Sequence, residues 1–155
     1  MSHGRARYHR RVTQPDVIDR PPALTPEARA FLAAPRFGVV GTIEPDGAPH
    51  QAVVWYRLDG DELVVNSADG RRWPANLRRD PRIVMTVQDG YRYVQVHGTV
   101  VIVDDQAIAQ ADIAEMARRY HADEPEEAET LIRDRFTRQH RVTFRFRPGR
   151  IFVDL

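Results

Sequence analysis

Apolar residues follow a helical period near the start of the chain and an alternating period soon afterwards. Residues 25–27, Thr-Pro-Glu, combine a capping hydroxyl, a proline suited to the first helical position and an acid for the first turn. A helix is therefore predicted from there to about Ala34. Residues 37–43 then alternate between two faces and stop at a cluster of turn-forming residues, 45–49, which predicts a strand entering a hairpin.

Alternating segments separated by turn residues continue through the rest of the chain. Gly98 lies in the middle of the longest segment and predicts a bulge or a barrel corner. Later strands are predicted at 50–58, 62–66, 82–87, 91–103 and 142–146, with room for a seventh strand at 151–155.

Three further segments have helical features. Residues 74–80 form a short predicted helix bounded by prolines, and apolar residues recur at helical spacing in 105–120 and 125–139. Strands joined by tight turns, with helices inserted late, indicate an α+β fold built on a six-stranded antiparallel β-barrel with flanking helices.

The length of the chain suits one domain preceded by an arm. Residues 1–22 are polar and Arg-rich and lack periodicity, so they are predicted to form a flexible N-terminal arm. The remaining residues, 23–155, are enough for one packed domain and too few for two.

Composition and charge exclude several classes of protein. The 23 basic residues are all arginine and face 22 acids, so the net charge of +1 gives no reason to expect a nucleic-acid or membrane partner. Cysteine is absent, which excludes disulfides, thiolate nucleophiles and iron–sulfur clusters. No apolar stretch approaches the roughly 20 residues of a membrane-spanning helix, and no secretory signal is found, so the cytoplasm is the expected compartment.

The motifs of common hydrolases and metalloenzymes are missing. The sequence has no nucleophile elbow, no phosphate-binding P-loop and no His-Glu-x-x-His string. Its six histidines lack the spacing of metal ligands, so no metal site is expected. His97 is interpreted as a hydrogen-bonded residue of the fifth predicted strand.

The second predicted strand is apolar on both faces. Residues 52–56 read Ala-Val-Val-Trp-Tyr, whereas an antiparallel strand with one face in water alternates. One face can fill the barrel, and two interpretations stay open for the other. Either a late helix covers it, or it meets a second subunit or a flat cofactor.

Residues 66–77 are the strongest candidate for a binding site. A strand ends there, a glycine-containing loop follows with a hydroxyl and two guanidinium groups, and a helix then begins, so unpaired N–H groups and arginine side chains converge. This arrangement predicts an anion site, most naturally for a phosphate. The competing interpretation pairs Arg71 and Arg72 with Asp69 and Asp80 in solvent. The candidate site comprises Asn66, Ser67, Arg71, Arg72, Trp73 and Asn76.

Two tyrosines lie together beside a turn. Tyr91 and Tyr93 share one face at the start of the fifth predicted strand. They either belong to the core or bracket an aromatic ring from a neighbouring subunit.

Longer strings stand out beside these local patterns. They lie at 41–50, 54–56, 66–82 and 91–100, and residues 76–82 read Asn-Leu-Arg-Arg-Asp-Pro-Arg. Together they resemble the pyridoxamine 5'-phosphate oxidase-like split-barrel superfamily, over about residues 25–150. Two further strings resemble its actinobacterial branch of flavin and deazaflavin oxidoreductases that uses coenzyme F420, and they lie at 111–120 and 141–148.

The resemblance implies an FMN-binding split barrel over 23–155 and a homodimer with two cofactor sites at the subunit interface. In this reading, reduced F420 passes a hydride to a small unsaturated or carbonyl-containing molecule. No residue is expected to be catalytic, because the chemistry belongs to the cofactor. Two alternatives stay open: an FMN-dependent oxidase or reductase of the pyridoxamine 5'-phosphate oxidase type, and a non-catalytic protein that binds F420 or FMN.

The resemblance also implies roles for individual residues. Trp73 departs from the pattern, since many relatives carry a lysine at this position. The arginines of the arm, between Arg5 and Arg11, are a candidate contact for the acidic tail of F420. Ala52, Val53, Val54 and Trp55 line the ring, Ser67, Arg71, Arg72 and Asn76 hold the phosphate, and Tyr91 and Tyr93 arrive from the other chain.

Overall fold

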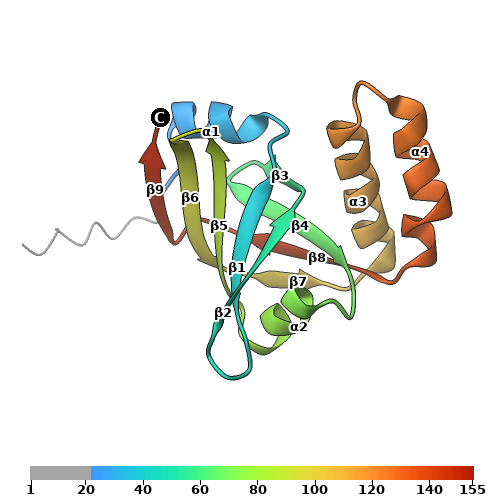
Figure 1. Ribbon diagram of the computed structural model, residues 1–155, viewed down its shortest axis with the longest axis horizontal. Coiled ribbons are helices and arrows are strands. Elements are labelled where there is room, and N and C mark those ends of the chain that lie inside the picture. The colour runs from blue at the N-terminus through green and yellow to red at the C-terminus, as the bar shows by residue number, and fades with distance from the viewer. Residues whose placement is uncertain (1–21) are drawn as a thin grey trace, which may run out of the picture.

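The computed structural model describes residues 22–155 and shows two antiparallel sheets with helices around them (Figure 1). The predicted arm lies outside the described residues except for Pro22. One sheet has the strand order β2-β1-β5-β6-β9 and the other has the order β3-β4-β8-β7. The strands are β1 (Gly38–Ile43), β2 (Pro49–Val54), β3 (Tyr56–Asp59), β4 (Glu62–Ala68), β5 (Arg82–Asp89), β6 (Arg92–Thr99), β7 (Val101–Val103), β8 (Arg141–Phe146) and β9 (Arg150–Asp154). The helices are α1 (Pro26–Ala33), α2 (Arg72–Arg79), α3 (Gln106–Tyr120), α4 (Pro125–Asp134) and the short 3₁₀ helix η1 (Phe136–Arg138).

The α+β class and the antiparallel pairing are confirmed, whereas the six-stranded barrel is not confirmed. Two predicted strands are each broken by one residue, Trp55 between β2 and β3 and Val100 between β6 and β7. At each break the chain leaves the five-stranded sheet and enters the four-stranded sheet. Residues 22–155 therefore form nine strands in two sheets, and no continuous ring of hydrogen-bonded strands closes among them.

Gly98 lies two residues before the break at Val100, which agrees with the corner predicted at this glycine. A Cβ atom at this position would lie 2.8 Å from the carbonyl oxygen of Arg147 and 2.9 Å from the ring of Phe146. Only glycine lets β6 approach the end of β8 this closely.

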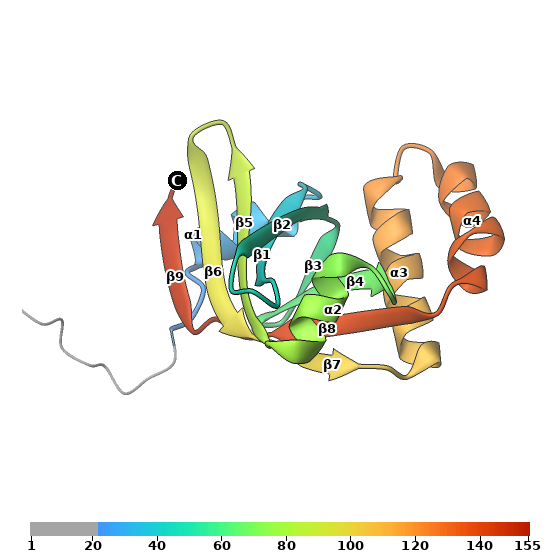
Figure 2. The same cartoon turned by 60° about the horizontal axis from the view of Figure 1, so that its bottom comes forward.

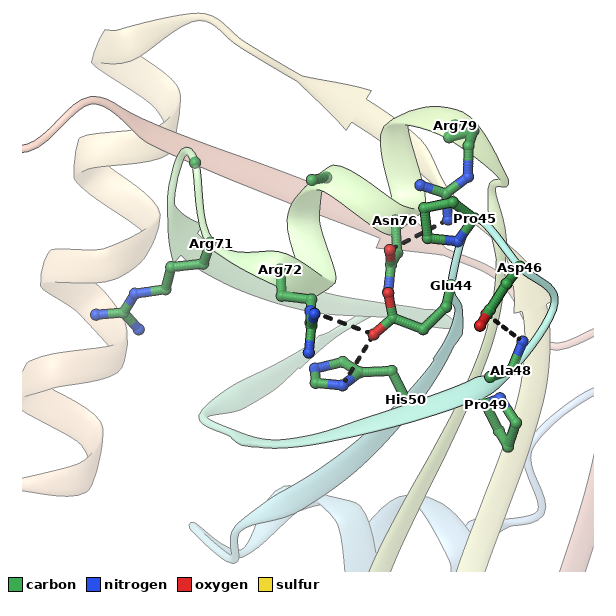
Figure 3. Close-up of a pocket in the computed structure, with 12 residues that line it drawn as sticks. Glu44, Pro45, Asp46, Ala48, Pro49, His50, Arg71, Arg72, Asn76 and Arg79 are labelled. Carbon is green, nitrogen blue, oxygen red and sulfur yellow. Dashed lines mark hydrogen bonds and ion pairs between the residues drawn. The ribbon is translucent and has the colours of Figure 1, made fainter.

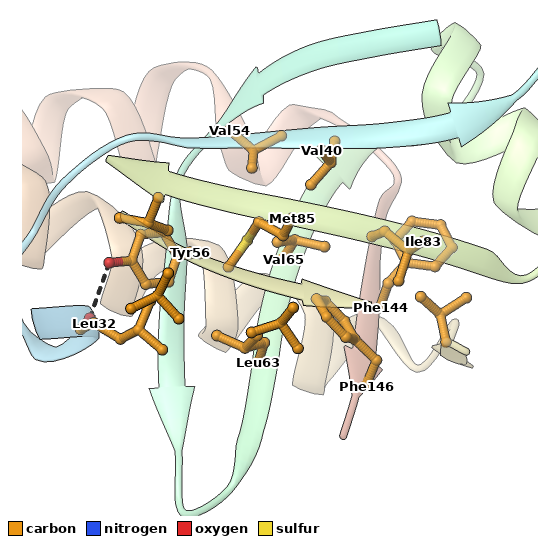
Figure 4. Close-up of a cluster of buried hydrophobic side chains, with 14 of the residues drawn as sticks. Leu32, Val40, Val54, Tyr56, Leu63, Val65, Ile83, Met85, Phe144 and Phe146 are labelled. Atoms are coloured by element: carbon orange, nitrogen blue, oxygen red, sulfur yellow. Dashed lines mark hydrogen bonds between the residues drawn. The ribbon is translucent and has the colours of Figure 1, made fainter. Parts of the chain in front are cut away.

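The main core fills the space between the two sheets (Figure 4). Val40 and Met85 reach into it from the five-stranded sheet, and Leu63 and Phe144 reach into it from the four-stranded sheet. The hydroxyl of Tyr56 donates a hydrogen bond of 2.9 Å to the carbonyl oxygen of Leu32 at the end of α1. Burial raises the pKa of this tyrosine, so its phenol stays protonated and keeps donating.

A second, smaller core lies between the four-stranded sheet and the hairpin formed by α3 and α4, which stands to one side of the sheets (Figures 1 and 2). Val64 faces Ile113 and Met116 of α3 there, while Ala128 of α4 and Phe136 of η1 complete the cluster. The four-stranded sheet is therefore covered on both faces.

The five-stranded sheet is covered on one face alone among residues 22–155. Its register places Val53, Val39, Thr86, Gln95 and Phe152 in one row across all five strands on the outer face. Most buried apolar residues of the four α-helices belong to the two cores, and no helix residue lies in this row. Val53 is 69% exposed as a result, so the interpretation that a late helix covers the second strand fails at this position. We call this surface the open sheet face.

Candidate functional site

The predicted anion loop lies where β4 ends and α2 begins. Gly70 adopts a positive φ of 87°, which turns the chain, and α2 begins at Arg72, two residues before the predicted start at Pro74. No side chain caps the N-terminus of α2, and its basic residues Arg78 and Arg79 lie in the last turn. The unpaired N–H groups and the positive end of the helix dipole are thus left beside the loop.

A wide hollow separates this loop from the turn between β1 and β2 (Figure 3). It has a volume of about 870 Å³, and we call it the hairpin hollow. Its floor comes from α2, including Asn76 and Arg79, and its far wall comes from residues 44–50. Arg71 and Arg72 lie at its rim.

Charged groups occupy part of this hollow. Glu44 forms an ion pair with Arg72 at an N–O distance of 3.4 Å, and the same carboxylate oxygen lies 3.4 Å from Nδ1 of His50. Arg79 donates hydrogen bonds to the carbonyl oxygen of Ile43 and, at 3.1 Å, to the side chain of Asn76. In Figure 3 Arg71 points away from this group, and it forms no ion pair with any residue of 22–155.

The competing interpretation of the two loop arginines is therefore wrong. Asp69 pairs instead with Arg78, at 3.1 Å, and Asp80 pairs with Arg82, at 2.6 Å. Among the described residues, Arg71 is left free for an external anion.

A second, smaller hollow of about 200 Å³ lies on the other side of Arg71, toward α3 and η1. We call it the helix-side hollow. Val53, Val54 and Trp55 of the second predicted strand reach it, as do Asn66 and Trp73. Arg71 is the one residue of 22–155 that lines both hollows, so the two meet at its side chain.

The predicted site residues divide among several places. Ser67 is buried and its hydroxyl donates to the carbonyl oxygen of Ala68 at 2.9 Å, so it faces neither hollow. Ala52 packs against the main core, and the amide of Asn76 donates to Thr42 at 3.1 Å. The residues brought together around Arg71 are Arg72 and Asn76 in the hairpin hollow and Val53, Val54, Trp55, Asn66 and Trp73 in the helix-side hollow.

The two tyrosines lie elsewhere in the chain. Tyr91 is 99% exposed, and with Tyr93 and Phe152 it lines a hollow of about 490 Å³ on the open sheet face. They line neither of the two hollows beside Arg71. Within one chain the tyrosines and the anion loop are therefore separate.

Two arginines of the site were missed by the sequence reasoning. Arg141, at the start of β8, is 3% exposed, and Arg135 lies just before η1; both line the helix-side hollow. Burial lowers the pKa of Arg141 to about 10, and the positive charges of Arg71 and Arg135 act in the same direction. The sequence held one clue. In an alternating strand Arg141 lies on the same face as Thr143, and Thr143 is buried.

Histidines contribute little to this region. His97 lies in β6 with its Nε2 atom 3.1 Å from the amide oxygen of Gln95, which confirms its interpretation as a hydrogen-bonded sheet residue. His121, Glu124 and Glu127 lie close together at the turn between α3 and α4, with potential ligand atoms within 4.8 Å of one another. The expectation that the protein uses no metal stays a prediction. None of the helices in residues 22–155 has both the length and the apolar character needed to cross a bilayer.

Fold and sequence together define the class of protein. Residues 24–152 match the family model described as pyridoxamine 5'-phosphate oxidase. The chain belongs to this family, which confirms the resemblance drawn from the strings between 41 and 100.

Individual relatives fit the deazaflavin branch of that resemblance. An F420H(2)-dependent biliverdin reductase of Mycobacterium tuberculosis (strain CDC 1551 / Oshkosh) is 25% identical over 112 residues, which are 70% of this chain and 81% of the relative. A solved structure named F420 Reductase is 27% identical, with a TM-score of 0.64, and covers 80% of this chain and 94% of its own. Conserved hypothetical protein Rv2991 from Mycobacterium tuberculosis is 28% identical, with a TM-score of 0.68, and covers 81% of this chain and 80% of its own.

Proposed function

We propose that this protein is an oxidoreductase that uses reduced coenzyme F420 to transfer a hydride to a small unsaturated or carbonyl-containing molecule. Its family and its named relatives support the coarser statement that it is an F420- or flavin-related oxidoreductase. The observation that carries the finer statement is the pair of hollows that meet at Arg71.

The residues around Arg71 fit the two chemically different parts of such a cofactor. Arg71 and Arg72, together with the uncapped start of α2, suit the phosphate, because guanidinium groups and free N–H groups both donate to oxyanions. Val53, Val54 and Trp55 offer an apolar wall for a flat ring and exclude water from it. When bound, reduced F420 supplies the hydride.

The apolar wall is also held rigid. Trp55 stacks on Tyr120 with ring centroids 5.1 Å apart and an interplanar angle of 10°, and the edge of Phe136 meets it at 6.3 Å. A fixed wall orients a ring without losing side-chain entropy on binding.

The size of the hairpin hollow favours F420 over FMN. FMN ends at its phosphate, whereas the hollow of about 870 Å³ extends well beyond Arg71 and carries two further arginines, Arg72 and Arg79. This space and charge suit an acidic tail attached to the phosphate. FMN-dependent chemistry is the second candidate, since the ring and the phosphate are common to both cofactors.

A homodimer completes the proposed site. The open sheet face carries apolar residues from both of its edge strands, including Val53 at the edge of the helix-side hollow. Pairing this face with that of a second copy buries Val53 and brings aromatic side chains, Tyr91 and Tyr93, toward the ring from the other chain.

Parallel titrations of the purified protein with F420 and with FMN, followed by cofactor fluorescence, test the proposal. We expect saturable binding of F420 at micromolar concentration and weaker binding of FMN. Oxidation of reduced F420 that depends on an added acceptor then separates an enzyme from a carrier. No binding of F420 in this range, or a preparation that is yellow with bound flavin, contradicts the proposal.

A further inference from the structure

A line of buried hydrogen bonds crosses the four-stranded sheet and ends at the helix-side hollow. Arg57 donates to Asp112 at 2.6 Å, and the hydroxyl of Thr143 donates to the other oxygen of Asp112 at 2.8 Å. The amide of Asn66 donates to Thr143 at 2.9 Å, which turns its own oxygen toward Arg141. Arg141 donates to that oxygen through Nε at 2.9 Å. Each group in the line has one orientation, so the guanidinium of Arg141 is held in place.

The end of Arg141 that faces away from this line is not matched by an acid. Its Nη1 atom donates to the amide oxygen of Gln139 at 2.6 Å, and within residues 22–155 its Nη2 atom donates to nothing. Arg71 and Arg135 also lack an ion pair in the described part of the chain. The helix-side hollow thus has three arginines in its lining and, within residues 22–155, no aspartate or glutamate.

Arg141 is the buried member of these three arginines, whereas Arg71 and Arg135 are exposed at the rim of the hollow. A buried charge without a partner is destabilising, and Arg141 is 3% exposed. The hairpin hollow differs in this respect, because Glu44 and Asp46 offset part of its charge. The lining of the helix-side hollow therefore carries the larger net positive charge of the two.

The walls and the size of the helix-side hollow define the rest of the ligand. Trp55, Phe136 and Ile113 are apolar, and the volume of about 200 Å³ suits one ring with one acid group. A carboxylate is planar and has two oxygens, which match the free edge of a guanidinium group.

We propose that the helix-side hollow binds an organic acid, with its carboxylate on Arg141 and Arg135 and its apolar body against Phe136 and Ile113. The wall formed by Val53, Val54 and Trp55 is left to the cofactor ring. This inference rests on the proposed function, because the bound acid is a substrate only if the protein is a reductase. The substrate is then an unsaturated or carbonyl-containing carboxylic acid, anchored beside the wall that receives the ring.

Benzoate and its neutral analogue benzamide test the proposal on the full-length protein, by calorimetric titration and thermal unfolding in chloride buffer. Wild type is expected to bind benzoate and to be stabilised by it, and to ignore benzamide. Arg135→Met, at an exposed residue that leaves the fold intact, and Arg141→Met are each expected to weaken benzoate at least about tenfold. Arg138→Met removes a nearby exposed arginine outside both hollows and serves as the matched control.

Equal binding of benzamide and benzoate would overturn the proposal, and so would an unchanged benzoate affinity in folded Arg135→Met. A third contrary result is a rise in unfolding temperature that depends on Arg135 with inorganic phosphate and not with benzoate. Arg72 lies in the hairpin hollow alone, so Arg72→Ala separates this inference from the proposed function. Loss of F420 binding in that variant with benzoate retained leaves the acid site standing. If the wild type binds benzoate and does not bind F420, the proposed cofactor is refuted and the proposed acid site stands.

Discussion

At the scale of single residues, the hairpin hollow offers a clean distinction between binding and stability. The side chain of Arg72 is 72% exposed and its one ion pair among the described residues, with Glu44, is long at 3.4 Å. Exposed pairs of this kind contribute little to the free energy of unfolding. A guanidinium that donates to a phosphate contributes much more to binding.

Arg72→Ala is therefore expected to weaken cofactor binding without unfolding the protein. The lost hydrogen bond to a charged group is worth about 2 kcal/mol, which corresponds to roughly a 30-fold rise in Kd. Fluorescence titration measures the affinity and urea unfolding measures the stability. An unchanged Kd moves the anion site away from this loop.

Acid sensitivity is a second property set by single residues. The hydrogen bond from Arg82 lowers the pKa of Asp80 from its ordinary value of 3.8 to about 2. Between these values the unfolded chain binds a proton that the folded chain does not. The stabilising effect of this pair is thus complete above pH 4 or so, and it disappears as the pH falls toward about 2.

Asp80→Asn should flatten the loss of stability over that interval. Urea midpoints measured at neutral pH, near pH 4 and near pH 2.5 give the slope. Asp123→Asn is the control, because Asp123 is exposed and forms no ion pair with the described residues. Parallel slopes for Asp80→Asn and wild type would show that the pair with Arg82 does not persist in solution.

The sequence carried part of this residue-scale information. Arg71, Arg72 and the nearby helix start are adjacent in the chain, so a local pattern revealed the anion loop. Arg141 and Arg135 reach the same region from the far end of the chain, through the packing of β8 and η1. No local pattern reports a contact between segments this distant.

At the scale of elements, periodicity identified the strands but not their breaks. Trp55 and Val100 lie in continuous apolar runs, 52–56 and 100–103, so no turn-forming residue marks either break. Contacts made after folding fix the breaks: Trp55 stacks on Tyr120, and the N–H of Val100 donates to the carbonyl oxygen of Pro81 at 2.9 Å. Gly98 did mark the second break, because the close approach of the chain there leaves no room for a Cβ atom.

Gly98→Ala should destabilise the protein at the second break. The new Cβ meets the carbonyl oxygen of Arg147 at 2.8 Å, and backbone cannot move aside as cheaply as a flexible side chain. Overpacking of this kind costs about 1–3 kcal/mol. Thermal unfolding of Gly98→Ala and of Thr99→Ala, its exposed neighbour, provides the comparison. Equal melting temperatures would mean that β6 and β8 are less closely packed than described.

At the scale of the whole molecule, the doubly apolar second strand has two explanations. Val53 lies on the open sheet face, and Tyr120 of α3 covers Trp55. The four-stranded sheet is covered by the main core and by α3 and α4, whereas residues 22–155 leave one face of the five-stranded sheet uncovered. Val84 lies near the middle of that face, on β5 beside Gly41 and His97. The proposed dimer and the proposed cofactor site therefore share one surface.

Val84→Glu is expected to dissociate the dimer, because two like charges then meet in an apolar interface. Light scattering after size exclusion should show the molar mass falling from near twice 17.8 kDa to near 17.8 kDa. Cofactor affinity should fall with it, since the partner's aromatic residues are lost. Ile108→Glu, on an exposed apolar residue of α3, is the matched control. A wild type that is monomeric would refute the interface.

A crystal structure of the protein soaked or grown with F420 would show directly whether the cofactor lies between Arg71 and the open sheet face. We expect phosphate oxygens within hydrogen-bonding distance of Arg71 or Arg72, and the ring against Val53 and Trp55 at a contact between two copies of the chain. Density for the cofactor at another place, with residues 66–77 facing solvent and remote from any neighbouring copy, would contradict it.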